Sequence, residues 1–478
     1  MWPHWIEGAR VEPQSGGMKS PVYDPATEEE LTEVRLDDTN SLEKALSSAQ
    51  RAFAGWQTTP VLERARVFFR YRELLEAHRH ELAECVSREN GKTFQDAFQE
   101  VGRGIEVVEL AAGAPTLLKG EILTEVAHGV DTTMVRAPLG VVAGITPYNF
   151  PAMIPLWMVP LALAAGNTFV LKPSERTPMT GLRLAELLQE AGLPPGVLSV
   201  VQGGKPIVDA LLADHRVRAV SFVGSQPVAH YVYQTAAKAG KRVQALGGAK
   251  NYHVVMPDAD LDSTVEALVG SAYGAAGQRC LAASVVIAVD PIGDELVARL
   301  KARGDQLVLG RGLDRSTEMG PLIRAEHRRR VLDFVEAGQA SGAQLVRDGR
   351  EHLPERGYFV GPTLFDRVKP EMTIAQEEIF GPVLSVMRAP SLEAAVNLAN
   401  RSRFGNTASL YTRSGGAARY FRDHIEAGML GINIGVAAPV AWFPFSGWKE
   451  SFYGDLHATG RDGIEFYTEK RVITERWI

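Results

Sequence analysis

The segment from Val141 to Leu246 most constrains the fold, because short apolar runs alternate there with helix-like stretches. Runs that are apolar throughout are typical of parallel strands buried on both faces. The alternation predicts an α/β fold with a doubly wound parallel sheet, and such sheets bind ligands beyond the carboxyl ends of their strands. The predicted strands are Val141–Ile145, Thr168–Leu171, Val197–Val201, Ala219–Val223 and Arg242–Leu246.

The helices between these strands carry their own signals. Pro151–Ala165 is apolar on all sides and predicts a buried helix. Thr177 and Pro178 predict the start of the next helix, with Thr177 as N-cap and Pro178 in the first position, and Gly192 ends it. Two further helices are predicted at 206–213 and 226–239.

The rest of the chain divides around this sheet. Helical apolar spacing precedes it at Leu42–Gly55, Val61–Glu89 and Phe94–Gly113. A second alternating half runs from Asn251 to Gly428, and a polar, aromatic tail follows. The 478 residues suffice for two or three domains at roughly 100–200 residues each.

Composition excludes several classes of protein. A net charge of −6 provides no field for nucleic acid or anionic lipid. Met1–Glu30 lacks the pattern of a targeting segment, and two cysteines cannot form a disulfide framework, so we expect a reducing, cytoplasmic location. The uncharged stretch Ala137–Leu171 is long enough to span a bilayer, but prolines and two asparagines interrupt it, so we predict no membrane span.

Of the two cysteines, Cys280 is the candidate nucleophile. It follows the small residues of Gly274–Gly277, which leave room for a ligand, and the positive charge of Arg279 favours its thiolate. A thiolate can attack a carbonyl and hold a covalent intermediate. The alternative is a buried structural cysteine. Cys85 has acidic neighbours, which raise the pKa of a thiol, and we interpret it as a packing residue.

Polar residues follow three of the predicted strands. Lys172 and Glu175 could hold a ribose diol, and Ser225 opens a helix whose free N–H groups favour a phosphate. Asn149 could donate a hydrogen bond to an oxyanion. The alternatives are a surface Lys–Glu pair, an ordinary helix cap and a turn amide. The G-x-G-x-x-G fingerprint of dinucleotide-binding folds does not occur between a strand and a helix.

Five motifs connect these residues: Pro147–Pro151, Leu171–Glu175, Phe222–Ser225, Gly277–Cys280 and Glu377–Pro382. Their order and spacing resemble the aldehyde dehydrogenase superfamily, and the resemblance covers essentially the whole chain. It implies an aldehyde dehydrogenase-like α/β fold in three parts. These are a doubly wound NAD-binding domain (1–117 and 138–250), an α/β catalytic domain with Cys280 (251–428), and a small oligomerisation flap (118–137 and 448–478). A homotetramer, a dimer of dimers, is the expected assembly.

The resemblance also assigns roles to residues. Cys280 is the nucleophile, and Asn149 forms the oxyanion hole with the Cys280 backbone N–H. NAD is the implied cofactor, with its adenosine ribose on Lys172 and Glu175, and no metal is expected. Glu175 favours NAD over NADP, because its charge repels a 2′-phosphate. The implied cofactor residues are Phe150, Lys172, Glu175, Arg176, Gly224, Ser225 at the pyrophosphate, Glu378 at the nicotinamide ribose, and Phe380.

One departure from the superfamily pattern concerns hydrolysis. Hydrolytic members carry a glutamate in a Leu-Glu-Leu-Gly-Gly-Lys motif, which activates water. The corresponding segment Val243–Asn251 is one residue longer here, and the position of that glutamate falls on Ala245 or Leu246, neither of which is a carboxylate. Without a base, water is a poor nucleophile toward an acyl-cysteine, whereas a thiol is partly ionised near neutral pH. The acyl group is therefore expected to pass to an external thiol, with coenzyme A the natural candidate.

The same departure is the pattern of the CoA-acylating methylmalonate-semialdehyde dehydrogenases. The implied substrate is malonate or methylmalonate semialdehyde, whose carboxylate suits Arg279 and, by the subfamily pattern, Arg103. The implied products are acetyl-CoA or propionyl-CoA, NADH and CO₂.

Two alternatives stay open at this point. A non-acylating NAD-dependent aldehyde dehydrogenase would need a water-activating carboxylate from elsewhere, such as Glu378. An inactive scaffold or binding protein on the same fold is the second, since a fold does not determine a function.

Overall fold

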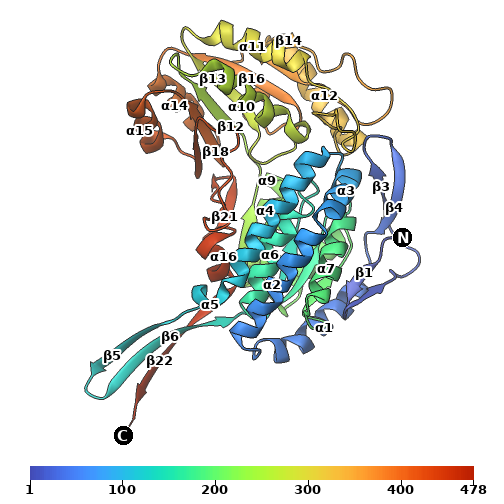
Figure 1. Cartoon of the computed structure of the whole chain (residues 1–478), viewed down its shortest axis with the longest axis vertical. Coiled ribbons are helices and arrows are strands. Elements are labelled where there is room, and N and C mark those ends of the chain that lie inside the picture. Colours follow the sequence, from blue (N-terminus) through green and yellow to red (C-terminus); the bar gives the residue numbers. More distant parts are fainter. Residues whose placement is uncertain (478) are drawn as a thin grey trace.

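The computed structural model describes residues 1–477, which form two α/β bodies and a protruding arm of β-strands (Figure 1). The first body is built on an eight-stranded sheet. Its strands are β1 (His4–Ile6), β2 (Ala9–Val11), β7 (Val141–Ile145), β8 (Thr168–Lys172), β9 (Leu198–Val200), β10 (Val217–Val223), β11 (Arg242–Leu246) and β21 (Phe452–Gly454).

The order of these strands is β2-β1-β9-β8-β7-β10-β11-β21, and the five central strands are parallel. All five predicted strands are therefore confirmed. The chain runs from β7 outward through β8 to β9, then returns to the other side of β7 with β10 and β11. The point between β7 and β10 is a topological switch point, where doubly wound sheets leave a crevice for a ligand.

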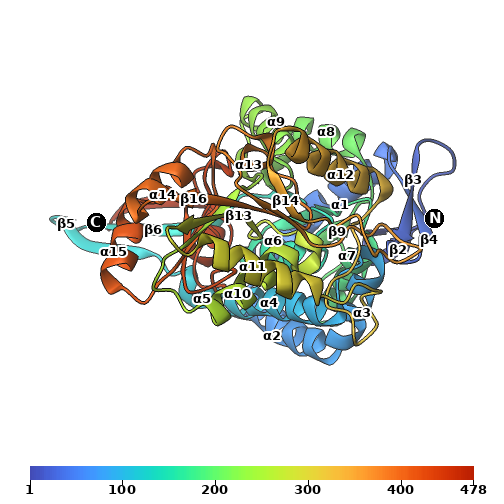
Figure 2. The same ribbon diagram turned by 90° about the horizontal axis from the view of Figure 1, so that it is seen from above.

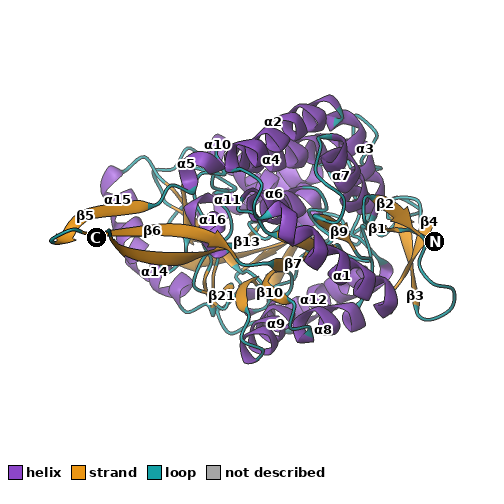
Figure 3. Ribbon diagram, turned by 90° about the horizontal axis from the view of Figure 1, so that it is seen from below, coloured by secondary structure: helices purple, strands orange, loops and turns teal. Residues whose placement is uncertain are grey.

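Helices cover both faces of this sheet (Figure 3). One face carries α2 (Val61–Ala77), α3 (Arg79–Asn90), α4 (Phe94–Ala112), α6 (Met153–Ala164) and α7 (Met179–Glu190). The other face carries α1 (Thr39–Trp56), α8 (Lys205–Ala213) and α9 (Gln226–Lys238). Alternate residues of β7 enter the two cores, with Val142 on the α6 side and Ala143 on the α1 side.

Two predictions about these helices need correction. The predicted helix 61–89 is broken at His78 into α2 and α3. The N-cap of α7 is Pro178, not Thr177, and no side chain of its own segment caps it. Instead, the buried carboxylate of Glu89 on α3 accepts hydrogen bonds from the N–H groups of Met179 and Thr180, at 2.7 and 2.9 Å. A tertiary contact thus replaces the local cap.

The uncharged stretch of the sequence lies inside the first body. All twelve residues of α6 are buried, although Pro160 lies within the helix. α6 packs against α4 and above β7 and β8. Among the described residues, the structure contains no helix with both the length and the apolar character required to cross a bilayer.

The second body has a seven-stranded sheet in the order β14-β15-β16-β13-β12-β18-β19. Its strands are β12 (Asn251–Val255), β13 (Ala283–Val289), β14 (Gln344–Arg347), β15 (Thr363–Asp366), β16 (Val383–Ala389), β18 (Thr407–Tyr411) and β19 (Met429–Ile432). All pair in parallel except β14 with β15. Its helices are α10 (Leu261–Tyr273), α11 (Gly293–Asp305), α12 (Ala325–Ala340), α13 (Thr373–Gln376), α14 (Leu392–Asn400) and α15 (Gly415–His424).

The arm is a three-stranded antiparallel sheet of β5 (Glu121–Ala127), β6 (Val130–Pro138) and β22 (Thr468–Arg476). It projects at the end opposite the hairpin of β3 (Lys19–Asp24) and β4 (Glu29–Arg35) (Figure 2). Only part of the predicted flap segment 448–478 lies in the arm. β21 joins the first sheet, and α16 (Gly460–Phe466) packs on α6. The remaining short elements are α5 (Ala114–Leu117), the 3₁₀ turn η1 (Gly274–Gly277), β17 (Phe404–Gly405) and β20 (Trp448–Lys449).

Candidate active site

Cys280 lies on the loop between α10 and β13, after a turn with an unusual backbone. Ala275 and Ala276 have positive φ angles of 50° and 52°, and Gly277 follows with a φ of 69°. Such angles cost an L-residue of order 1–2 kcal/mol. A Cβ at Gly277 would lie 2.3 Å from the main-chain oxygen of Gly381, so this position requires glycine for two reasons. Tertiary packing therefore holds the turn that delivers Cys280.

Two side-chain amides hold the main chain at Cys280 itself. The Cys280 carbonyl oxygen accepts hydrogen bonds from Nδ2 of Asn251 and from Nδ2 of Asn406, each at 2.9 Å. Asn251 also donates to the carbonyl of Ala282, at 2.8 Å. Both asparagines are buried. The peptide of the candidate nucleophile is therefore fixed before any ligand binds.

Two cavities meet at this cysteine. The larger, of about 770 Å³, lies at the carboxyl ends of β7, β8 and β10, over the switch point of the first sheet. The smaller, of about 270 Å³, lies on the other side, between α4 and α6. Within residues 1–477, Cys280 is the single residue that lines both. The thiol of Cys280 can thus be approached from both cavities.

Asn149 lies on the larger cavity, beside Cys280. It belongs to the turn between β7 and α6 and is 7% exposed. Its Nδ2 donates to the main-chain oxygen of Gln278 at 3.0 Å. An amide nitrogen carries two N–H groups, so this bond orients the amide and leaves one donor for another acceptor.

Lys172 and Glu175 lie together in the larger cavity, at the end of β8. Their Nζ and Oε2 atoms are 3.4 Å apart. Burial disfavours the charged form of Glu175, but the neighbouring ammonium of Lys172 and the guanidinium of Arg176 outweigh it, so the pKa of Glu175 lies below 4.5. The cavity thus offers a charged donor beside a charged acceptor, which suits a pair of hydroxyl groups.

The start of α9 faces the same cavity. Gly224 and Ser225 follow β10 and line it, with Pro227 in the first turn of the helix. The side chain of Ser225 forms no capping hydrogen bond, so the first-turn N–H groups have no side-chain partner there. A helix N-terminus of this kind favours an anion such as a pyrophosphate.

Glu378 forms the wall of the larger cavity near Cys280. Its Oε1 accepts a hydrogen bond from the N–H of Ala249 at 2.9 Å. Its Oε2 lies 2.6 Å from the place where a Cβ of Gly248 would be, so a side chain there would collide. Burial raises the pKa of Glu378 to about 7. This carboxyl group therefore changes charge near neutral pH.

The segment that lacks the hydrolytic glutamate is also resolved in space. Ala245 and Leu246 end β11 and are buried in the cores on the two faces of the sheet. Gly247 is the residue of this segment that lines the larger cavity. In the part of the chain that the structure describes, the carboxyl groups lining this cavity are those of Glu175, Glu326 and Glu378. None of them comes from 242–251.

The smaller cavity is largely apolar, with two arginines in its wall. Asp96, Glu100, Arg103 and Val107 line it from one face of α4, at helical spacing. The opposite wall is apolar and comprises Phe150, Met153, Trp157, Val436, Ala441 and Phe445. Arg279 completes the wall beside the thiol.

Both arginines already have carboxylate partners. The Arg279 guanidinium lies 2.7 Å from Asp96, and that of Arg103 lies 2.8 Å from Glu106. Arg103 also donates to the main-chain oxygen of Pro439. A guanidinium has five N–H donors, so each arginine keeps donors for a further carboxylate.

The ionisation of Cys280 differs from the sequence-based expectation that Arg279 favours its thiolate. Burial raises the pKa of its thiol to about 12, and the nearby Glu378 adds to the rise. Arg279 acts in the predicted direction but is outweighed, because desolvation dominates and Asp96 shares its charge. Burial also raises the pKa of Cys85, with Glu89 contributing, in the predicted direction.

The predicted cofactor residues are brought together with one exception. Arg176 and Phe380 line the larger cavity with the residues described above. Phe150 lines the smaller cavity instead. The Lys92 ammonium lies 4.3 Å from the centre of its ring. The turn between Pro147 and Pro151 directs Asn149 and its neighbour Phe150 to opposite sides.

Sequence reasoning missed several residues of the site. The larger cavity extends between α8 and α9, where Lys205, Val208, Val228 and Tyr231 line it. Helical spacing marked these positions only as surface or core. Asn251 at the start of β12 and Asn406 between β17 and β18 were missed as well, because a single asparagine carries no sequence signal of a tertiary contact.

Comparison with known proteins places the chain among related sequences. The model of the aldehyde dehydrogenase family matches residues 11–473. Malonate-semialdehyde dehydrogenase 2 of Geobacillus kaustophilus (strain HTA426) is 55% identical over 476 residues, which cover 99% of this chain and 98% of that protein. The malonate-semialdehyde dehydrogenase of Halalkalibacterium halodurans is 55% identical over 475 residues, with the same coverage.

Solved structures agree with these matches. The crystal structure of methylmalonate-semialdehyde dehydrogenase (DddC) from Oceanimonas doudoroffii superposes with a TM-score of 0.98 and 50% sequence identity, and the match covers 100% of this chain and 98% of that one. A putative methylmalonate-semialdehyde dehydrogenase from Sinorhizobium meliloti 1021, complexed with NAD, gives 0.98 and 46%, over 99% and 97% of the two chains.

Proposed function

The chain belongs to the aldehyde dehydrogenase family, and we propose that it is an NAD-dependent, CoA-acylating malonate- or methylmalonate-semialdehyde dehydrogenase that forms a thioester on Cys280. The observation that carries the proposal is the position of Cys280, where a cofactor-sized cavity meets a small cavity with two arginines. The relatives named above supply the substrate class.

The larger cavity fits NAD. Lys172 and Glu175 would hold the adenosine ribose, the N-terminus of α9 after Ser225 the pyrophosphate, and Glu378 the nicotinamide ribose. The related structure from Sinorhizobium meliloti 1021, which is complexed with NAD, supports NAD as the cofactor. When bound, NAD accepts the hydride from the aldehyde carbon. The negative charge of Glu175 disfavours a 2′-phosphate and thus NADP.

Cys280 and Asn149 act at the aldehyde carbon. The Cys280 thiol, which is protonated near neutral pH, first gives its proton to solvent, and the thiolate then attacks the carbonyl. The developing oxyanion accepts hydrogen bonds from the free N–H of Asn149 and from the backbone N–H of Cys280. The two amides on the Cys280 carbonyl oxygen fix the peptide that follows Cys280, and so anchor the main chain next to the reacting thiol. Such preorganised donors stabilise the transition state because they need no rearrangement when the charge appears.

Arg279 and Arg103 select the substrate. The smaller cavity of about 270 Å³ admits a short aldehyde, and the guanidinium groups bind its carboxylate with paired hydrogen bonds. Once the thioester has formed, the carboxylate lies β to a thioester carbonyl. Loss of CO₂ then leaves an enolate, which is protonated to the acetyl or propionyl thioester.

The acyl group is then transferred from Cys280 to the thiol of coenzyme A rather than to water. The segment that carries the water-activating glutamate in hydrolytic members presents only Gly247 to the cavity. A thiol is a far better nucleophile than unactivated water toward a thioester. Among the described carboxyl groups that line the larger cavity, Glu378 is the one whose charge acts on Cys280, and it could activate water, so hydrolysis is the outcome to test against.

The deciding experiment mixes enzyme, NAD and malonate semialdehyde in a stopped-flow instrument, with and without CoA. We expect a burst of about one equivalent of NADH without CoA, and steady turnover only with it. Full turnover without CoA would favour the hydrolytic enzyme and contradict acyl transfer. Cys280→Ala is the matched control and should show neither burst nor turnover, whereas Cys85→Ala should show both.

For assembly, we propose a tetramer formed through the arm. Ile122, Leu123 and Val126 of β5 and Val472 of β22 expose large apolar side chains on a projecting sheet. Exposed apolar strands of this kind favour burial against another copy. Light scattering coupled to size-exclusion chromatography should give four copies, and Val472→Lys should reduce that number.

A further inference from the structure

A buried ion pair lies directly behind Asn149. Lys92 precedes α4 and Glu100 lies on it, and their side chains are 1% and 0% exposed. Lys92 Nζ is 2.5 Å from Glu100 Oε2 and donates to the main-chain oxygen of Asn149 at the same distance. An ion pair removed from water needs further hydrogen bonds to offset its desolvation, and here those bonds go to the Asn149 turn.

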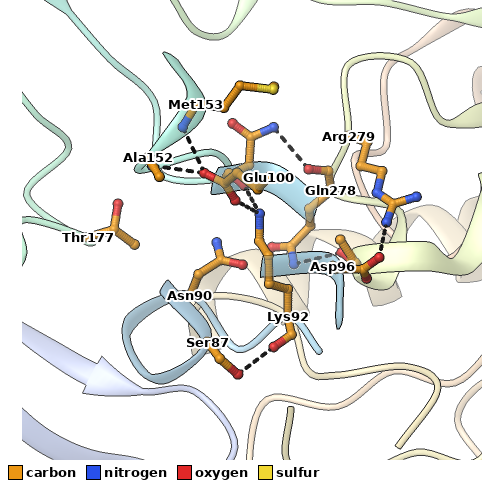
Figure 4. Close-up of polar contacts among 12 residues, drawn as sticks. Ser87, Asn90, Lys92, Asp96, Glu100, Ala152, Met153, Thr177, Gln278 and Arg279 are labelled. Carbon is orange, nitrogen blue, oxygen red and sulfur yellow. Dashed lines mark hydrogen bonds and ion pairs between the residues drawn. The ribbon is translucent and has the colours of Figure 1, made fainter. Parts of the chain in front are cut away.

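Glu100 contacts the other end of the same turn. Its Oε1 accepts hydrogen bonds from the N–H groups of Ala152 and Met153, at 2.8 and 3.1 Å (Figure 4). α6 has no side-chain cap of its own, so Glu100 caps it from another helix. The backbone from Asn149 to Met153 is thus held at both ends by one pair of side chains.

On the catalytic side, the Asn149 amide is also fixed. Its Nδ2 donates to Gln278, two residues before the nucleophile, at 3.0 Å. The backbone position set by Lys92 and the amide orientation set by Gln278 together determine where the remaining N–H points. That N–H faces the oxyanion in the proposed mechanism.

We propose that Lys92 and Glu100 are positioning residues for the oxyanion donor, holding Asn149 at the distance from Cys280 that the transition state requires. The proposal rests on the proposed role of Asn149. Catalysis by preorganised donors is sensitive to displacement of about 1 Å, which can slow a reaction 10²-fold.

The chain contains a natural comparison for this pair. Glu89 caps α7 in the same way, from α3, with two backbone N–H groups and the hydroxyl of Thr180 as donors. Among the described residues it has no lysine partner, and its hydrogen bonds go to Met179 and Thr180 and not to the Asn149 turn. Capping a helix from its neighbour therefore needs only the carboxylate. The additional lysine at Glu100 is explained by its contact with Asn149.

The test is a double-mutant cycle on the NADH burst. The variant Lys92→Met/Glu100→Gln removes both charges together, which avoids an unpaired buried charge, and keeps an oxygen to cap α6. We expect a burst rate constant about 10–100-fold lower than that of the parent enzyme. In the Asn149→Ala background the same change should lower it less than about threefold, because the donor it positions is gone.

Three controls keep the result interpretable. Glu89→Gln, the matched change at α7, should show no coupling to Asn149→Ala. NAD affinity, measured by fluorescence titration, should change less than about threefold in the pair variant. If the pair variant does not fold, Lys92→Met alone removes the ammonium that contacts Asn149, while Glu100 keeps the two N–H groups of α6 and can be neutralised by taking up a proton. This single variant should then give a smaller slowing that likewise disappears in the Asn149→Ala background.

Equal slowing in both backgrounds, or no slowing in a folded variant, would overturn the proposal. These failures differ from failure of the proposed function. If Asn149→Ala itself leaves the burst unchanged, the oxyanion assignment is wrong and this proposal is wrong with it. If Asn149→Ala slows the burst but the pair variant does not, only the positioning role is lost.

Discussion

The guanidinium of Arg279 lies 2.7 Å from the carboxylate of Asp96, so the arginine next to Cys280 is ion-paired before any substrate binds. Asp96 belongs to α4 of the first body, whereas Arg279 lies in the second body, just before β13. The pair therefore joins the two bodies across the smaller cavity, and a substrate carboxylate must share Arg279 with Asp96.

The first prediction concerns this shared arginine. Arg279→Gln should raise KM for malonate semialdehyde about 10–100-fold, because charged hydrogen bonds contribute about 1.5–3 kcal/mol. KM for propanal, which has no carboxylate, should change little. Asp96→Asn frees the guanidinium and should lower KM for the semialdehyde. Equal changes with both aldehydes would show that Arg279 acts on the loop rather than on the carboxylate.

A second prediction concerns Arg103 and its partner Glu106, which also line an outer cavity of about 410 Å³ between α2 and α4. Both oxygens of Glu106 lie within 3.0 Å of Arg103. Glu106→Gln should lower KM for the semialdehyde a few-fold, more at low salt, because the competing charge is gone. Glu109→Gln, whose carboxylate lines only the outer cavity, is the control. An unchanged KM in both variants would show that Glu106 does not compete with the substrate for Arg103.

A third prediction concerns the thiol. Because the pKa of Cys280 is raised to about 12, alkylation by iodoacetamide should be slow at pH 7 and rise about tenfold per pH unit above it. Glu378→Gln removes a nearby negative charge and should speed alkylation several-fold at fixed pH. Mass spectrometry should find the label on Cys280 and not on Cys85. A pH-independent rate would contradict the raised pKa.

The fourth prediction concerns NAD affinity and pH. Burial raises the pKa of Glu378 to about 7, so the protonated form predominates at pH 6 and the ionised form at pH 8. Ribose hydroxyls donate to a carboxylate, so the ionised form binds NAD better. Kd should fall about tenfold from pH 6 to pH 8, as the ionised fraction rises from about one tenth to about nine tenths. Calorimetry should show this dependence flattened in Glu378→Gln.

Much of the first body could be predicted from sequence, because its central strands are buried on both faces. The strands Val141–Ile145 and Arg242–Leu246 have the bounds that the sequence predicts. Val141–Ile145 is apolar throughout, which is typical of a strand buried on both faces, whereas Arg242–Leu246 also contains Arg242 and Gln244. The cap of α7 could not be predicted from sequence, because it comes from Glu89, 90 residues earlier than Met179. Local signals such as Thr177-Pro178 cannot report a partner from another helix.

The sequence by itself determined the fold class, the candidate nucleophile Cys280 and the absence of a carboxylate in Val243–Asn251. These are matters of residue type and local order along the chain. The tertiary structure decided that Cys280 lies where two cavities meet, that Phe150 faces the smaller one, and that the thiol is held protonated. It also revealed Lys92 and Glu100 behind Asn149, some 50 residues away in the chain. Such properties depend on desolvation and on contacts between distant segments, which exist only once the helices have packed on the sheet.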